Sequence, residues 1–242
     1  MEPQAGQESS PAPRINLGPG ETKRILGSLL LAVFTVMLGV GIIAPLLPGY
    51  AQSLGANGIV LGLIFSIFSL FRTFFTPVTG ILSDRWGRKH FITAGMFAYF
   101  ILSLAYVQAQ STPVLLVVRA LHGLAAALIV PVANAYVGDL APPEREGTYM
   151  GLFLASFLAG FALGPALGGI LYDRLGMASC FFTLGLLALP ALALILVFVP
   201  NLRTGQDEGG NQRQGRRGWA SFSPPFKQLQ GQDSPRARWC PV

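Results

Sequence analysis

The sequence predicts an all-α membrane protein with six transmembrane helices arranged as an inverted repeat of three plus three. Three observations predict this fold: a low content of charge, six long apolar runs, and a short string that recurs three runs later. Of 242 residues, 52% are hydrophobic and only 12% are charged, whereas soluble domains carry about 25% charge. The charges lie in patches between the apolar runs, as expected because a charged side chain at the bilayer centre costs about 2.5–3.5 kcal/mol.

The apolar runs define the domain organisation. They lie at residues 25–48, 59–82, 91–109, 113–138, 148–171 and 178–200. Each can cross about 30 Å of hydrocarbon at a rise of about 1.5 Å per residue, and in lipid such runs must be helical because no water satisfies the backbone. We therefore predict a transmembrane domain over residues 25–200. Residues 1–24 and 201–242 are rich in polar residues, Gly and Pro, and are predicted to be disordered.

Basic residues gather on alternate connections between the runs. They are Arg14, Lys23 and Arg24 before the first run, Arg85, Arg88 and Lys89 after the second, Arg145 after the fourth, and Arg203, Arg213, Arg216 and Arg217 after the sixth. The opposite connections carry only Arg174. By the positive-inside rule, both termini are predicted to be cytoplasmic in a multi-pass protein of the plasma membrane. The net charge of +6 follows from this topology and does not indicate a nucleic-acid partner.

The recurring string supports the inverted repeat. Gly-Ile-Leu-x-Asp-Arg-x-Gly stands at residues 80–87, after the second run, and again at residues 169–176, after the fifth. An offset of three helices is odd, so the two copies must lie on opposite sides of the membrane. Such nested repeats of opposite topology occur in each half of some transporters.

Four motifs give the sequence a family resemblance. They are Gly80-x-Leu82-x-Asp84-Arg85-x-Gly87-Arg88-Lys89, then Arg119-x-x-x-Gly123, then Gly160-x-x-x-Gly164-Pro165-x-x-Gly168-Gly169, and Leu38-Gly39 followed by Pro45-x-x-Pro48. The first resembles the signature loop of the major facilitator superfamily, and the second its fourth-helix motif. The third and fourth resemble motifs of its antiporters and of its twelve-helix drug-proton antiporters. The resemblance covers residues 25–200 and implies the amino-terminal half of a major facilitator fold.

The signature loop is a candidate cytoplasmic gate. In similar transporters the loop is linked to an acidic residue at the end of the fourth helix, which here matches Asp139. The resemblance implies that Asp84, Arg88 and Asp139 form a latch whose ion pairs differ between inward-facing and outward-facing states. The positive-inside rule accounts for the basic residues but not for the two acids. The alternative is that these charges only fix the topology.

Small residues mark the fifth run. Ser156, Gly160, Gly164 and Gly168 recur at a spacing of four, so one helix face carries only small side chains. Such a face allows another helix to approach closely in lipid. Pro165 removes one backbone hydrogen bond and can bend the helix. The resemblance adds a role in the antiport cycle for this bend.

Ionisable groups inside the membrane are candidates for function by default. Arg72 lies 12 residues before Asp84, about 18 Å deep, on a stripe with Ser66, Ser69 and Thr73. It would meet an anionic substrate or a carboxylate of another chain, unless helix carbonyls and water satisfy it.

Three residues of the fourth run are candidates for a substrate or proton pathway. The resemblance implicates Arg119 in proton movement. His122, where the family usually has Gln, can change charge near neutral pH and is either a proton carrier or a hydrogen-bonded structural group. Asn134 is a further candidate. No Asp or Glu lies deep in any run, which leaves proton coupling open.

The resemblance implies a secondary active transporter of the multidrug or small-molecule efflux type that works by alternating access. A metabolite or organic-anion carrier would suit Arg72, and a truncated, non-transporting membrane protein is a third possibility. The expected partners are the lipid bilayer, a small-molecule substrate, protons, and a second six-helix half or a second copy. An enzyme is not expected, since no His-Glu-x-x-His site, Gly-x-Ser-x-Gly elbow or P-loop is present. No metal site or cofactor is predicted.

Overall fold

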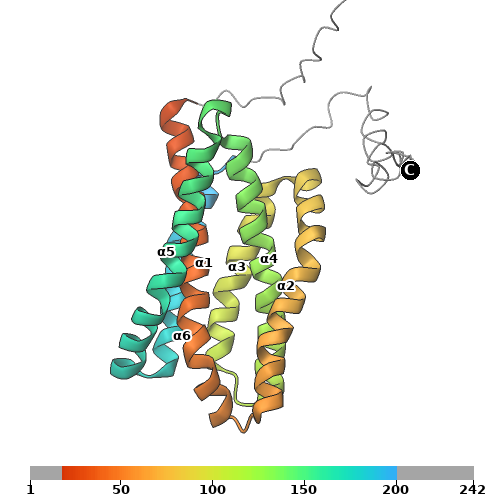
Figure 1. Ribbon diagram of the computed structural model, residues 1–242, viewed down its shortest axis with the longest axis vertical. Helices are drawn as coiled ribbons and strands as arrows, with labels where there is room; N and C mark the ends of the chain where they lie inside the picture. The colour runs from red at the N-terminus through yellow and green to blue at the C-terminus, as the bar shows by residue number, and fades with distance from the viewer. Residues whose placement is uncertain (1–17, 201–242) are drawn as a thin grey trace, which may run out of the picture. The chain divides into compact units, whose positions relative to one another are not determined.

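The computed structural model describes residues 18–200, which form six long helices joined by short turns (Figure 1). The helices are α1 (Pro19–Ser53), α2 (Gly58–Trp86), α3 (Arg88–Val107), α4 (Thr112–Leu140), α5 (Glu146–Leu175) and α6 (Met177–Phe198). A single 3₁₀ turn, η1 (Pro143–Arg145), precedes α5, and this part of the chain contains no strand. All six helices are long and apolar enough to cross a membrane. The predicted all-α fold with six transmembrane helices is confirmed.

The first helix begins earlier than predicted. Residues 19–24, assigned from the sequence to a disordered segment, form the first turns of α1. Pro19 stands at the first helical position, where its missing N–H is not needed and its fixed φ suits the helix. Glu21 in the first turn complements the helix dipole. The rest of the segments predicted to be disordered, residues 1–17 and 201–242, lies outside the described residues.

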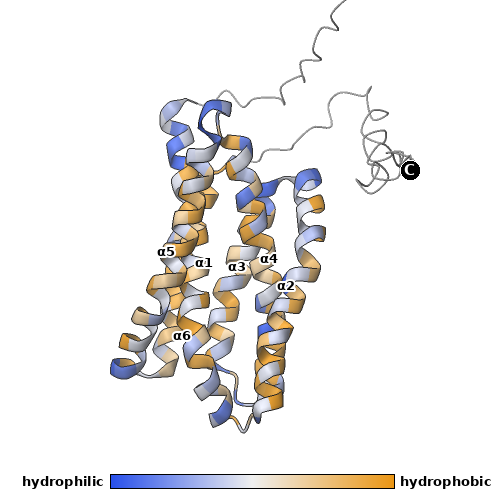
Figure 2. Ribbon diagram, in the orientation of Figure 1, coloured by the Kyte–Doolittle hydropathy of each residue, from blue (hydrophilic) through white to orange (hydrophobic). Residues whose placement is uncertain are grey.

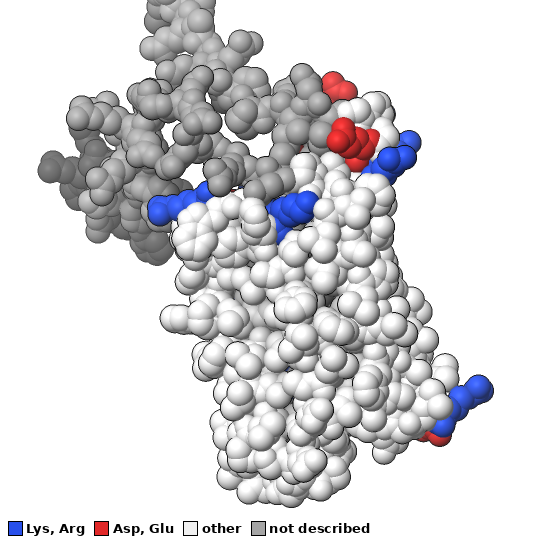
Figure 3. Space-filling view, turned by 180° about the vertical axis from the view of Figure 1, so that it is seen from behind, with Lys and Arg blue, Asp and Glu red and all other residues white. Residues whose placement is uncertain are grey.

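Polar and charged residues lie at the two ends of the bundle. Figure 2 shows apolar residues dominating the middle of the helices and hydrophilic residues at their ends. On the face shown in Figure 3, Lys, Arg, Asp and Glu gather at opposite ends and leave a wide uncharged belt between them. This distribution fits a bundle whose middle lies in hydrocarbon.

The packing of the helices repeats with the order predicted for an inverted repeat. The most extensive contacts join α1 to α5 and α2 to α4, followed by α3 with α4, α3 with α6 and α1 with α6. If α1, α2 and α3 are exchanged with α4, α5 and α6, respectively, the same set of contacting helix pairs results. α1 and α4 are the central helices, because 61% of the most apolar stretch of each is buried, against 11% for α2 and 17% for α5.

The two copies of the repeated string each end in a glycine with positive φ. Gly87 between α2 and α3 has φ of 96°, and Gly176 between α5 and α6 has φ of 79°. Such φ values suit glycine and strain other residues. Each glycine N–H donates to a carbonyl four residues earlier, at 3.0 Å to Ser83 and 2.9 Å to Tyr172. The last glycine of the string therefore allows a helix to end and the next to begin without a loop.

Candidate functional site

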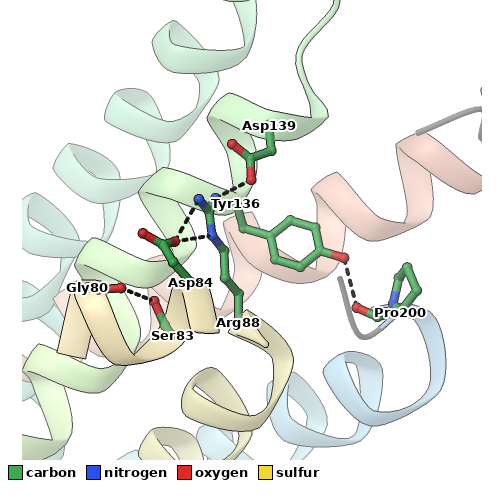
Figure 4. A network of polar contacts seen from close by, with 7 residues as sticks. All are labelled: Gly80, Ser83, Asp84, Arg88, Tyr136, Asp139 and Pro200. Atoms are coloured by element: carbon green, nitrogen blue, oxygen red, sulfur yellow. Dashed lines mark hydrogen bonds and ion pairs between the residues drawn. The ribbon is translucent and has the colours of Figure 1, made fainter. Parts of the chain in front are cut away.

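Three charged side chains of α2, α3 and α4 meet at one end of the bundle (Figure 4). Arg88 donates from Nε and Nη2 to Oδ1 of Asp84, at 3.1 and 3.0 Å, and its Nη1 lies 2.6 Å from Oδ2 of Asp139. The Arg88 side chain is only 8% exposed, against 53% for Asp84 and 35% for Asp139. We call these three residues the latch. One guanidinium thus bridges two carboxylates, by charge-assisted hydrogen bonds to Asp84 and by an ion pair with Asp139.

The turn at Gly87 positions the latch. Because α3 starts immediately after this glycine, Arg88 is its first residue and lies four residues from Asp84 across the turn. Asp139 comes from the last turn of α4. The end of the bundle at which α2 passes into α3 and α4 ends is called the latch end below.

The remaining polar residues of the signature loop do not join the latch. Arg85 is exposed, and Lys89 instead donates from Nζ to the carbonyl oxygen of Leu196 in α6 at 2.8 Å. Gly80 faces open space: a Cβ added there would have no neighbour within 4 Å. Of the two glycines singled out in the loop, Gly87 is the one whose backbone requires glycine.

Sequence reasoning missed Tyr136, which lies beside the latch in Figure 4. Its ring is buried, and its hydroxyl donates to the carbonyl oxygen of Pro200 at 2.9 Å. The spacing of three residues between Tyr136 and Asp139 puts both on one face of α4. That spacing is the one signal in the sequence that could have identified it.

Arg119 and His122 lie in the interior, 5% and 1% exposed. The guanidinium of Arg119 donates from Nε to the carbonyl oxygen of Ile64 at 3.4 Å. Its carbon lies 4.7 Å from the ring centroid of Phe68 and 5.6 Å from that of Phe65. Within residues 18–200 no carboxylate pairs with this cation. A backbone carbonyl and two aromatic faces stabilise the charge instead.

His122 is held among aromatic rings. Its Nδ1 lies 3.0 Å from the Tyr106 hydroxyl, and its ring meets Tyr99 edge-on with centroids 4.8 Å apart. Nε2 is buried without a hydrogen-bond partner. These contacts are those expected of a structural histidine, and the role of proton carrier stays a prediction.

The polar stripe of α2 faces outward. Ser66, Ser69 and Thr73 are exposed and line a groove of about 720 Å³ whose other walls are apolar and include Leu116 of α4. Arg72 is half-buried beside this groove on the same helix. Asn134 of α4 is exposed. The structure therefore separates the four intramembrane candidates into two in the core and two toward the surface.

The glycines of α5 form its contact with α1. A Cβ added at Gly164 would lie 2.5 Å from the Cα of Gly41, and one added at Gly168 would lie 3.2 Å from the Cα of Ile42. A Cβ at Gly160 would clash with the carbonyl oxygen of Phe34. The predicted close approach of a neighbouring helix is present, and the neighbour is α1.

The other motif residues of α1 and α5 take different positions. Gly39 lies against the hydroxyl of Tyr99, whereas a Cβ added at Gly169 would have no neighbour within 4 Å. Pro45 and Pro48 lie inside α1, and Pro165 lies inside α5. Both helices are assigned as continuous through these prolines.

The fold and these features define a multi-pass membrane protein of a transporter class, represented by one bundle of six helices. A family model described as Major Facilitator Superfamily matches residues 29–233. The chain belongs to the major facilitator superfamily.

Individual relatives agree with this assignment. An uncharacterised MFS-type transporter of Methanocaldococcus jannaschii is 39% identical over 180 residues, covering 74% of this chain and 46% of the relative. The quinolone resistance protein NorA of Staphylococcus aureus is 28% identical over 123 residues, covering 51% and 32%. The solved structure of the human organic anion transporter TETRAN matches with a TM-score of 0.65 and 26% identity, covering 76% of this chain and 49% of that one. The chain spans about half the length of the Methanocaldococcus jannaschii transporter and of TETRAN.

Proposed function

We propose that the chain is one of two six-helix halves of a secondary active transporter that works by alternating access and exports small, largely hydrophobic compounds. The outward face of α2 is the observation that carries this proposal. Only 11% of its most apolar stretch is buried, and the exposed part carries the hydroxyls of Ser66, Ser69 and Thr73. A largely apolar face with these hydroxyls in a row suits a transport pathway between two halves as well as a contact with lipid, and the half-buried Arg72 on the same helix favours the pathway.

The groove along this face supports a hydrophobic cargo. Its volume of about 720 Å³ lies within the range of about 300–1,000 Å³ that holds small molecules. Its walls are mostly apolar, with three hydroxyls to orient a ligand. NorA, which resembles the chain over 51% of its length, is a quinolone resistance protein, and export of such compounds is the most specific form of the proposal.

The latch supports alternating access. Two carboxylates on α2 and α4 share Arg88 of α3, so a relative movement of these helices must exchange or break ion pairs. We propose that the latch is closed in one state of the transport cycle and open in the other. We also propose that the latch end is cytoplasmic and that the protein lies in the plasma membrane, because basic residues gather at this end.

An organic-anion carrier is the second candidate. Arg72 and Arg119 are two cations within the membrane-spanning helices, and no Asp or Glu lies deep in any apolar run. The structural similarity to an organic anion transporter agrees with a pathway that favours negative charge. On this candidate, Arg72 contacts the anion directly. Proton coupling, on either candidate, would use a group such as His122 in this half or a carboxylate supplied by the second half.

An efflux panel in cells that express the whole chain tests these proposals. Hydrophobic cations, neutral drugs and organic anions would be compared with and without an uncoupler of the proton gradient. Efflux of hydrophobic compounds that the uncoupler abolishes supports proton-coupled export, and efflux restricted to anions supports the second candidate. Arg72→Ala should then abolish anion efflux, whereas Arg174→Ala, at the opposite end from the latch, serves as control. No efflux of any compound, in cells where the chain is shown to pair with a second half, would favour a non-transporting membrane protein.

The need for a second half is tested separately. A single cysteine at position 69 (Ser69→Cys), with Cys180 and Cys240 replaced by Ser, would report on what faces α2. We expect oxidative cross-linking either to a second copy or to a separate six-helix protein. Efflux by a chain shown to be monomeric in the membrane would contradict the proposed pairing.

A further inference from the structure

The end of α6 is held by side chains from two other helices at the latch end. Lys89 of α3 donates to the carbonyl oxygen of Leu196 at 2.8 Å, and Tyr136 of α4 donates to the carbonyl oxygen of Pro200 at 2.9 Å. The last carbonyls of a helix lack partners within the helix and favour a nearby cation. α6 carries no basic residue in its own last turn. Lys89 of α3 therefore supplies the positive charge that the last turn of α6 lacks.

Both contacts come from residues next to the latch. Lys89 follows Arg88 directly, and Tyr136 lies three residues before Asp139 on the same face of α4. The ion pair between Arg88 and Asp139 thus connects the two backbone segments that carry the contacts to α6. Opening of this ion pair would free the segments of α3 and α4 that bear Lys89 and Tyr136 to move apart, and the two contacts with α6 would then not both persist.

We propose that Tyr136 and Lys89 are positioning residues that couple the end of α6 to the latch. In this arrangement the chain leaving α6 at Pro200 is held while the latch is closed and released when it opens. The inference rests on the proposed role of the three charged residues as a latch. It adds that the state of the latch is transmitted to the end of α6 at Val199 and Pro200, and that the position of this end biases the latch in return, as the reciprocity of coupled equilibria requires.

Val199 offers a direct probe of this release. Its side chain is 1% exposed, and it lies directly before Pro200, the residue held by Tyr136. In the whole chain carrying Val199→Cys, with Cys180 and Cys240 replaced by Ser, the rate of maleimide labelling in detergent micelles measures how often the end of α6 opens. The measurement needs neither transport nor a known orientation in the membrane.

Two conservative changes test the coupling. Tyr136→Phe removes only the hydroxyl, and Asp139→Asn weakens the ion pair without changing size. Each should raise the labelling rate about fivefold, the change in an opening equilibrium that the loss of about one net hydrogen bond produces. If the two sites are coupled, the double variant should be labelled no faster than about fivefold, because either change alone has already released α6.

A matched control separates coupling from a general loosening. Tyr149 is half-buried near the start of α5, and within the described residues its hydroxyl makes no hydrogen bond to another side chain or to the backbone. Tyr149→Phe should leave the labelling rate unchanged. The inference is overturned if Asp139→Asn leaves labelling at the rate of the parent, or if the double variant multiplies the two single effects. Either result stands whether or not the efflux panel detects transport, so the two proposals fail independently.

Discussion

The two copies of the repeated string share a backbone but differ in the charges they hold. After both α2 and α5, a glycine with positive φ ends one helix and begins the next. After α2, the following residue is Arg88, which binds Asp84 and Asp139. After α5, the equivalent position is Met177, and neither Asp173 nor Arg174 takes part in an ion pair within residues 18–200. The glycine turn is thus present in both copies, whereas among the described residues ion pairs form only in the first copy, at the latch end.

The two halves of the repeat also differ in how their outer helices pack. α5 contacts α1 through the glycines at 160, 164 and 168. At the position of α2 equivalent to Gly168, Thr79 instead donates its hydroxyl to the carbonyl oxygen of Ala127 in α4 at 2.9 Å. The α2–α4 interface also contains a close approach at glycine, because a Cβ added at Gly123 of α4 would clash with the carbonyl oxygen of Phe68 in α2. Both interfaces therefore use glycine, on the outer helix α5 in one half and on the central helix α4 in the other, where the hydroxyl of Thr79 adds a hydrogen bond.

The largest effect is expected from filling the glycine interface of α5. Gly164→Leu would place a branched side chain where even a Cβ lies 2.5 Å from the backbone of Gly41, and overpacking of this kind costs about 3 kcal/mol. Gly169→Leu is the matched control, since a Cβ at that position has no neighbour within 4 Å. Unfolding in detergent, followed by circular dichroism during heating, measures both. Equal stability of the two variants would contradict the assigned interface.

Removing the shared arginine of the latch is expected to have the next largest effect. Arg88→Ala leaves two carboxylates close together without their cation, and should lower the free energy of unfolding by about 1–2 kcal/mol. It should also abolish most of any transport measured in the efflux panel. Arg174→Ala, in the other copy of the string, should change stability by less than about 0.5 kcal/mol. If the two alanine variants behave alike, the latch has no special role.

Replacing the turn glycines should affect both copies equally. Gly87→Ala and Gly176→Ala each force a Cβ into a backbone region that disfavours it, at a cost of roughly 1–2 kcal/mol. The same thermal unfolding assay reports the cost. A marked difference between the two variants would show that the turns are not equivalent in spite of their similar φ angles.

The smallest effect on stability is expected from Asp84. Its side chain is 53% exposed, so water screens the pair with Arg88, and Asp84→Asn should cost less than about 1 kcal/mol. Transport should nevertheless slow, because the exchange of ion pairs in the latch is altered while membrane insertion is not. Asp173→Asn provides the control from the other copy. Unchanged transport in Asp84→Asn would argue against the latch.

Much of this arrangement was predictable because it depends on patterns along one chain segment. Apolar length predicted six helices, and the spacing of Gly160, Gly164 and Gly168 predicted a close helix contact. The repeated string predicted an inverted repeat of three plus three helices, and the order of helix packing agrees with it. The grouping of Asp84 and Arg88 with Asp139 came from the resemblance to a family motif, and the structure brings these three side chains together.

The contacts that sequence reasoning missed join helices far apart in the chain. Tyr136 and Pro200 are 64 residues apart, and no local period connects them. The rings of Phe65 and Phe68 under Arg119 look in the sequence like ordinary apolar residues of α2. Their role depends on the rotation of α2 against α4, which the packing of the whole bundle sets. The start of α1 was placed too late because hydropathy alone does not register a helix that extends beyond the hydrocarbon.

The position of Arg119 over the rings of Phe65 and Phe68 has an electrostatic consequence. Because this guanidinium carries a permanent positive charge and no acid within residues 18–200 neutralises it, the interior of the bundle holds a fixed positive potential. A monovalent ion about 10 Å away would feel about 1.7 kcal/mol at an effective dielectric constant near 20. At that distance a monovalent cation would thus be disfavoured more than tenfold relative to a neutral group, and a monovalent anion favoured by the same factor.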